Sequence, residues 1–116
     1  MATSPTIQIV SGGSAKVISW VGLANGQSGD SVEDSLWADR SVQVTGTFGA
    51  GGSVTIEGSN DGTNWASLTD PQGNNLSFST SKIETVIEMV RFIRPNITNG
   101  DGTTSLNIVL FQRGNV

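Results

Sequence analysis

Two residue types that often carry out enzyme chemistry are missing from this sequence. It contains no histidine and no cysteine, which removes the commonest general base, the thiolate nucleophile and the usual zinc ligands. Carboxylates remain, and a pair of them is what glycoside hydrolysis requires. The candidates are Glu57, Asp61, Glu84 and Glu88, but their spacing fixes no separation of the required kind. We therefore expect that the chain is not an enzyme.

Several side chains with oxygen atoms at residues 60–64 are a candidate calcium site. Asn60, Asp61 and Asn64 supply the oxygens, and Asp101 is a carboxylate that could approach them. However, the spaced acidic ligands of a calcium loop are absent, and a tight turn whose Asx side chains bond their own backbone uses the same residue types. We interpret the cluster as a turn around Gly62 and expect no metal and no other cofactor.

The three tryptophans are candidates for binding a partner. Trp65 opens a strand, where it either stacks on a sugar ring or covers the core. Trp37 lies in a polar, acidic stretch, and Trp20 precedes that stretch. An aromatic residue in such a setting is either a lid over the core or an anchor in a partner's pocket.

Two arginines are a further candidate contact. Arg91 and Arg94 flank an aromatic and an aliphatic residue, and the spacing places them on opposite faces of a strand. One interpretation is a pair of surface ion pairs with Glu84 or Glu88. The other is a contact with a partner protein, because arginine is enriched at interfaces.

The hydrophobic periodicity predicts strands and turns along most of the chain. Apolar residues alternate with polar ones over 42–48 and again over 54–57, with glycines between, which predicts a hairpin. Residues 58–64 are small and Asx types suited to a tight connection, and a further strand is predicted from residue 65. We expect Ile56, Leu68, Ile93 and Ile108 in the core.

The last predicted strand, residues 106–112, is apolar on both faces. Leu106, Ile108 and Leu110 lie on one face, and Val109 and Phe111 lie on the other. Two apolar faces indicate burial on both sides or an interface.

Three segments are less regular. Residues 7–9 and 16–21 predict two further strands, and Ser31 with Asp34 could cap one helical turn. Residues 81–90 fit helical spacing and a capping box, but their β-branched content and the strand behind them favour a short helix or an irregular strand.

Composition restricts the partners. The net charge of −4 repels phosphate backbones and anionic lipid, so we expect neither nucleic acid nor a membrane surface as a partner. The 116 residues suffice for one core without a disulfide or a metal. The predicted fold is therefore a single all-β domain, an antiparallel β-sandwich of jelly-roll-like form.

Residues 38–113 resemble small virion proteins of tailed bacteriophages, the capsid decoration or cement type. The resemblance lies in the stretch 38–70 and in the strings DPQGN at 70–74, RFIRP at 91–95 and GDGTT at 100–104. It implies a β-sandwich on the outer face of an assembled head that binds across neighbouring major capsid proteins. A weaker resemblance of residues 59–65 and 91–94 to discoidin-like, carbohydrate-binding jelly rolls implies an alternative, a glycan-binding module in a virion fibre or an extracellular protein.

The resemblance to capsid decoration proteins implies a structural virion protein made in the bacterial host cytoplasm and placed on the outer capsid surface. We expect residues 1–5 to be a flexible lead-in, residues 6–37 to form N-terminal strands and an acidic loop that leave room for an arm, and residues 38–113 to form the sandwich. We also expect self-association into a trimer or dimer. The candidate partner-binding residues are Trp20, Trp37, Arg91, Arg94, Val109 and Phe111.

Overall fold

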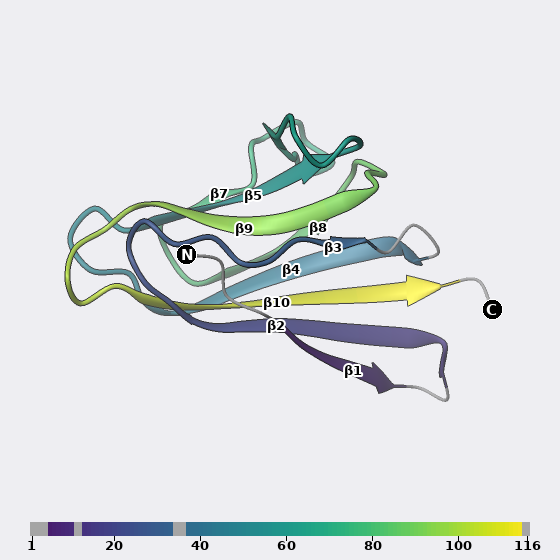
Figure 1. Cartoon of the computed structure of the whole chain (residues 1–116), viewed down its shortest axis with the longest axis horizontal. Helices are drawn as coiled ribbons and strands as arrows, with labels where there is room; N and C mark the ends of the chain where they lie inside the picture. The colour runs from purple at the N-terminus through teal and green to yellow at the C-terminus, as the bar shows by residue number, and fades with distance from the viewer. Residues whose placement is uncertain (1–4, 11–12, 34–36, 115–116) are drawn as a thin grey trace.

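The computed structural model describes residues 5–10, 13–33 and 37–114, and these form strands and connections without an α-helix (Figure 1). The strands, in chain order, are β1 (Thr6–Val10), β2 (Ala15–Leu23), β3 (Val32–Glu33), β4 (Trp37–Thr47), β5 (Ser53–Ser59), β6 (Ala66–Ser67), β7 (Ser77–Phe78), β8 (Lys82–Val86), β9 (Phe92–Asn99) and β10 (Ser105–Gly114).

The strands make two antiparallel sheets. The first sheet has the order β1-β2-β10-β4-β8, and the second has the order β3-β9-β5-β6, with β7 also paired to β5. Figure 1 shows β5 and β9 of the second sheet layered over β4 and β10 of the first. The predicted all-β antiparallel sandwich is therefore confirmed.

The core lies between the two sheets and follows the period-two alternation of the strands. Side chains of β10 that point inward, such as Leu106 and Ile108, have no exposed surface. They belong to one cluster with inward side chains of the second sheet. The four residues predicted for the core, Ile56, Leu68, Ile93 and Ile108, are all buried.

The hairpin predicted over residues 42–57 is wrong. β4 pairs with β10 and β8 in the first sheet, whereas β5 pairs with β9, β6 and β7 in the second. The glycine-rich connection at 48–52 thus carries the chain from one sheet to the other. Alternation alone cannot distinguish the two arrangements, because Val44 and Ile56 are buried in either. The next connection does form a hairpin, since β5 pairs with β6.

Two segments for which the sequence allowed helical structure contain strands. β8 pairs with β4 from Val44 to Arg40, so residues 82–86 are strand and the helical alternative is wrong. Residues 32 and 33 form β3 and pair with β9, which rules out the predicted helical turn at that point, while residues 34–36 lie outside the described part of the chain. In both cases a neighbouring strand supplies the backbone partners that decide the conformation.

Trp20 is a core residue. Only 1% of its surface is exposed, and its indole Nε1 donates a hydrogen bond of 2.9 Å to the carbonyl oxygen of Asp30. β2, which carries it, is an interior strand of the first sheet rather than part of an arm. The prediction that Trp20 contacts a partner is therefore wrong, because β2 directs the ring between the sheets.

Candidate partner-binding groove

The outer face of the first sheet carries the two candidate residues of β10. Leu110 points into the core, so its neighbours Val109 and Phe111 point outward. Val109 is half-buried, and Phe111 is 42% exposed. The sequence allowed two explanations for the apolar outer face of β10, burial on both sides or an interface. Because Phe111 is exposed, burial does not explain it, and the interface is the explanation that remains for this residue.

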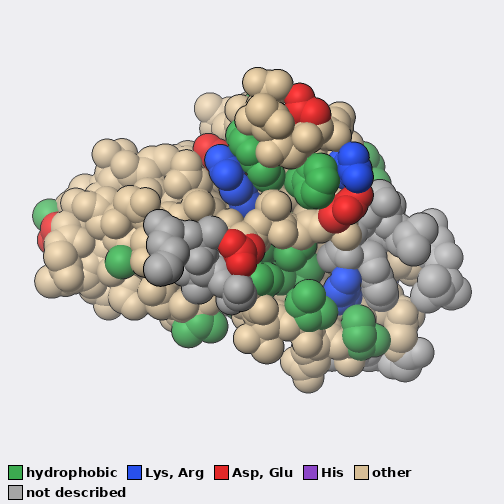
Figure 2. Space-filling view, in the orientation of Figure 1, with side chains coloured by type: hydrophobic (Ala, Val, Ile, Leu, Met, Phe, Trp, Pro, Cys, Tyr) green, Lys and Arg blue, Asp and Glu red, His purple; other side chains and the backbone are tan. Residues whose placement is uncertain are grey.

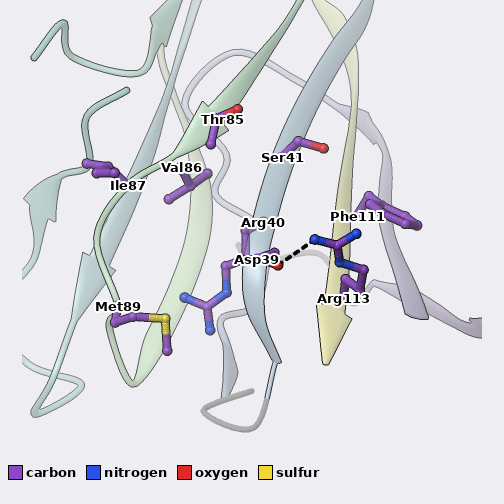
Figure 3. Close-up of a pocket in the computed structure, with 9 residues that line it drawn as sticks. All are labelled: Asp39, Arg40, Ser41, Thr85, Val86, Ile87, Met89, Phe111 and Arg113. Carbon is purple, nitrogen blue, oxygen red and sulfur yellow. Dashed lines mark hydrogen bonds and ion pairs between the residues drawn. The ribbon is translucent and has the colours of Figure 1, made fainter. Parts of the chain in front are cut away.

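A groove of about 550 Å³ lies beside Phe111 (Figure 3). Figure 3 shows Phe111 and Arg113 of β10 on one side of β4, and Ile87 and Met89, from the segment after β8, on the other. Ile87 and Met89 are exposed, at 55% and 54%. The groove is lined by Asp39, Arg40, Ser41, Thr85, Val86, Ile87, Met89, Phe111 and Arg113.

The groove exists because β8 ends before β4 does. β8 pairs with β4 only as far as Arg40, whereas β10 follows β4 further, to Trp37. After Val86 the chain turns towards the second sheet, and Ile87 N donates a hydrogen bond of 3.0 Å to Thr69 O. The early end of β8 leaves the space that Ile87 and Met89 border.

Glu88 fixes the segment that borders the groove. Its carboxylate accepts hydrogen bonds from the backbone N–H of Thr69, at 2.8 Å, and from the Thr69 hydroxyl. Partial burial acts to raise the pKa of Glu88, but these hydrogen bonds outweigh it and lower the pKa below its ordinary value. Because the carboxylate is held on both oxygens, the groove wall is attached at this point to the segment that follows β6.

Two polar contacts within the chain involve side chains that line the groove. Asp39 lies opposite Arg113 on the neighbouring strand, and Arg113 Nη2 is 2.8 Å from Asp39 Oδ2. Arg40 is buried, and its Nε donates a hydrogen bond of 2.8 Å to Gln112 Oε1. The lining therefore combines apolar side chains with an exposed ion pair, which suits the binding of a partner side chain.

The two candidate arginines have other partners than predicted. Arg91 Nε is 2.5 Å from Glu33 Oε2, and Arg94 Nε is 3.0 Å from Glu57 Oε1. Glu84 instead lies 3.4 Å from Lys82 Nζ. The predicted ion pairs with Glu84 or Glu88 are therefore wrong. Strand order explains the error, because β9, which begins next to Arg91, lies between β3 and β5 and not beside β8.

Trp65 does not offer an open face on the side where Arg94 lies. The guanidinium carbon of Arg94 is 3.9 Å from the centroid of the Trp65 ring. A sugar that stacked on this face would have to displace an arginine that is also paired with Glu57.

The oxygen cluster at residues 60–64 is a self-bonded turn. Asp61 accepts hydrogen bonds from Asn64 N and Thr63 N, each at 2.8 Å, and from the Ser59 hydroxyl at 2.9 Å. Hydrogen bonds from Asn64, then Thr63 and Ser59, lower the pKa of Asp61 below its ordinary value. Gly62 has a φ of +76°, the left-handed conformation that glycine tolerates.

Asp101 cannot complete a metal site with Asp61. In the β5–β9 register Ser53 lies opposite Asn99 and Ser59 lies opposite Phe92. Asp61 therefore follows the C-terminal end of β5, whereas Asp101 follows the end of β9 that lies beside the N-terminal end of β5. Instead, Asp101 accepts a hydrogen bond of 2.9 Å from Ala50 N and one of 2.6 Å from the Thr103 hydroxyl. Within the described ranges, no three acidic side chains gather in a way that could hold a metal ion.

Sequence reasoning missed the groove wall formed by Ile87 and Met89. The signal was present, because a strand at 82–86 that buries Val86 must point Ile83 and Ile87 outward. Trp37 gives backbone pairing to Gly114, but its side chain lies outside the described part of the structure. The proposed contact through Trp37 therefore stays a prediction.

Charged side chains are few on the face that Figure 2 shows. They lie singly or beside a charge of the opposite sign, with apolar side chains between them, and most of this face is backbone and other side chains. Among the residues that the structure describes, none forms a helix long and apolar enough to cross a membrane.

Comparison with solved structures shows a likeness in fold. A SPBc2 prophage-derived protein, YomS, superposes with a TM-score of 0.64 at 7% sequence identity. The match covers 84% of this chain and 93% of YomS. No protein-family model matches the sequence, and no curated protein matches it either. The likeness supports the sandwich architecture, and the neighbour that shares it comes from a prophage.

Proposed function

We propose that this chain is a structural virion protein of a bacteriophage that binds the outer surface of the assembled head, across neighbouring major capsid proteins. The observation that carries the proposal is the apolar groove on the open face of the first sheet, between Phe111 and Met89. Exposed apolar side chains around a concave site are typical of a surface that receives another protein.

Three further observations support this function over catalysis. The chain has no histidine or cysteine, the carboxylate in the groove is paired with Arg113, and a protein of similar fold comes from a prophage. A small domain that acts without chemistry has to act by binding. We therefore propose that it is not an enzyme, that it needs no cofactor and that it resides on the virion after synthesis in the host cytoplasm.

Lattice binding also fits the size of the molecule. A 116-residue domain offers only a standard-size patch for each contact, of about 800 Å² per partner. Stable attachment then requires several contacts at once, which an assembled lattice provides and an isolated capsid subunit does not. We expect tight binding to heads and weak binding to free subunits.

The test uses heads purified from phage that lack this protein. Wild-type protein added back should occupy the heads, as measured by electron microscopy and by co-sedimentation. Phe111→Ala and Met89→Ala should each lower occupancy without lowering the melting temperature. Val21→Ala is the matched control, because Val21 is 64% exposed on the same sheet but is not among the groove residues.

Two results would count against the proposal. If the groove variants occupy heads as fully as Val21→Ala does, the groove is not the contact. If the wild-type protein fails to bind heads but binds a polysaccharide in a glycan screen, the carbohydrate-binding alternative replaces it.

A further inference from the structure

The edge strand β1 exposes two isoleucines on the side of the first sheet that elsewhere forms the core. Ile7 lies opposite Ile18 of β2, so both side chains are on the inner face of the sheet. Ile18 has no exposed surface, whereas Ile7 is 53% and Ile9 is 55% exposed. The difference arises because β1 extends beyond the second sheet, as Figure 1 shows where β1 lies past β2 and away from β5 and β9.

β1 also has an unprotected backbone edge. It pairs with β2 on one side, and no other described strand pairs with it. Unpaired edge strands bind further strands readily, so natural proteins shorten them or place charges on them. β1 has neither protection, because its five residues include no charged side chain and no proline.

The other edges of the two sheets are protected. β8, at the opposite edge of the first sheet, carries Lys82 and Glu84. In the second sheet, the edge strands β3 and β6 have two residues each. Among the described strands, β1 is the long, uncharged edge, and this contrast marks it as a pairing surface.

The side chains of β1 have a two-fold pattern. Ile7 and Ile9 flank Gln8 symmetrically. If two copies of β1 pair antiparallel about Gln8, Ile7 of each copy lies opposite Ile9 of the other, on one face. On the other face the two Gln8 side chains lie opposite each other, and an amide can both donate to and accept from a second amide.

We propose that β1 pairs with β1 of a second copy of this chain, in antiparallel register centred on Gln8, and joins the first sheets of the two copies. The pairing closes with two-fold symmetry, so it forms a dimer and not a filament. The net charge of −4 on each copy does not oppose it locally, because β1 carries no charge. The contact is small, below about 1,200 Å² in total, so the dimer should depend on protein concentration.

Single cysteines test the register. The sequence contains no cysteine, so a disulfide in a Gln8→Cys variant must link two copies. Residues directly opposite on antiparallel strands have Cα atoms about 4.5–5.5 Å apart, which suits a disulfide. Thr6→Cys is the matched control: Thr6 is exposed on the same face of the same strand, but in this register it lies opposite Val10 of the other copy. Gln8→Cys should oxidise to a covalent dimer, and Thr6→Cys should stay largely monomeric.

Sedimentation velocity tests the interface without cross-linking. With rising concentration the wild-type protein should shift from 12.1 kDa towards twice that mass. Ile7→Lys with Ile9→Lys should abolish the shift. Ile83→Lys with Ile87→Lys is the control, because both residues are exposed, Ile83 on β8 and Ile87 directly after it, at the opposite edge of the first sheet from β1, and the change in charge is the same. The control should associate as the wild type does.

The proposal is overturned if the wild type remains monomeric at all concentrations, if Thr6→Cys cross-links as fast as Gln8→Cys, or if the lysine variant on β1 still dimerises. These measurements use purified protein alone, so they do not depend on the proposed function. A failure here would leave the head-binding test unaffected.

Discussion

The guanidinium group of Arg94 lies over the Trp65 ring, with its central carbon 3.9 Å from the ring centroid, while its Nε is 3.0 Å from Glu57 Oε1. The three side chains come from β9, from the residue before β6, and from β5. These contacts join β9, its neighbour β5 and the connection between β5 and β6 on the outer face of the second sheet. Trp65, which the sequence suggested as a residue that stacks on a sugar, has a structural role on this side.

The contact predicts a measurable loss of stability. Arg94→Ala removes both the cation–π contact and a partly buried ion pair, and it should lower the free energy of unfolding by about 1–2 kcal/mol. Arg113→Ala is the control, because Arg113 and Asp39 are both 67% exposed. Its cost should stay below about 0.5 kcal/mol. Urea titrations of both variants check the prediction, and equal costs would contradict it.

The core of the sandwich makes a second prediction. Ile108 has no exposed surface and is among the inward side chains of β10. Ile108→Ala should therefore cost about 2–5 kcal/mol, because it removes buried methyl groups and leaves a cavity. Ile83→Ala, at a residue that is 61% exposed, should change stability by less than about 0.5 kcal/mol. A cost below about 0.5 kcal/mol for Ile108→Ala would place its side chain outside the core.

How far the sequence predicts this molecule depends on whether a feature is local. The alternation in 106–112 is local, and it correctly separates Ile108 from Phe111. Strand order is not local, and for that reason the sequence predicts the wrong glutamates as the ion-pair partners of Arg91 and Arg94. The groove has the same origin, since it depends on where β8 stops pairing with β4.

Trp20 illustrates a different limit. Composition around it suggests an exposed aromatic, yet the ring is buried because the backbone at Gly29 approaches it closely. A Cβ atom added at Gly29 would overlap Cδ1 and Nε1 of the Trp20 ring. No residue pattern near Trp20 predicts this contact, because Gly29 is held in place by β9: its backbone N–H donates a hydrogen bond of 2.9 Å to Pro95 O.

The close approach predicts the effect of a single methyl group. Gly29→Ala should lower the free energy of unfolding by about 1–3 kcal/mol, because the core must shift to admit it. It should also change tryptophan fluorescence. Gly102→Ala is the control, because a Cβ there meets nothing within 4 Å. Chemical denaturation followed by fluorescence measures both, and unchanged stability of Gly29→Ala would contradict the packing at Trp20.

Acid should weaken the fold through carboxylates that accept hydrogen bonds in the turns. Hydrogen bonds from the Thr103 hydroxyl and from Ala50 N lower the pKa of Asp101 from 3.8 to about 2. Hydrogen bonds also lower the pKa of Asp61 and, led by the backbone N–H of Asn74, that of Asp70. A group whose pKa is lower in the folded state stabilises the fold when it is ionised. Its contribution is complete above the unfolded pKa and is lost as the pH falls through the folded pKa.

The melting temperature should therefore hold from neutral pH down to about 4 and fall as the pH approaches about 2. Asp101→Asn keeps one acceptor oxygen but cannot titrate, so its melting temperature should be lower than that of the wild type at neutral pH and should fall less between those two pH values. Thermal denaturation of both proteins across this range makes the comparison. If the two proteins lose the same amount between pH 4 and pH 2, Asp101 does not link the turn at residues 49–52 to the turn at 100–104 through its charge.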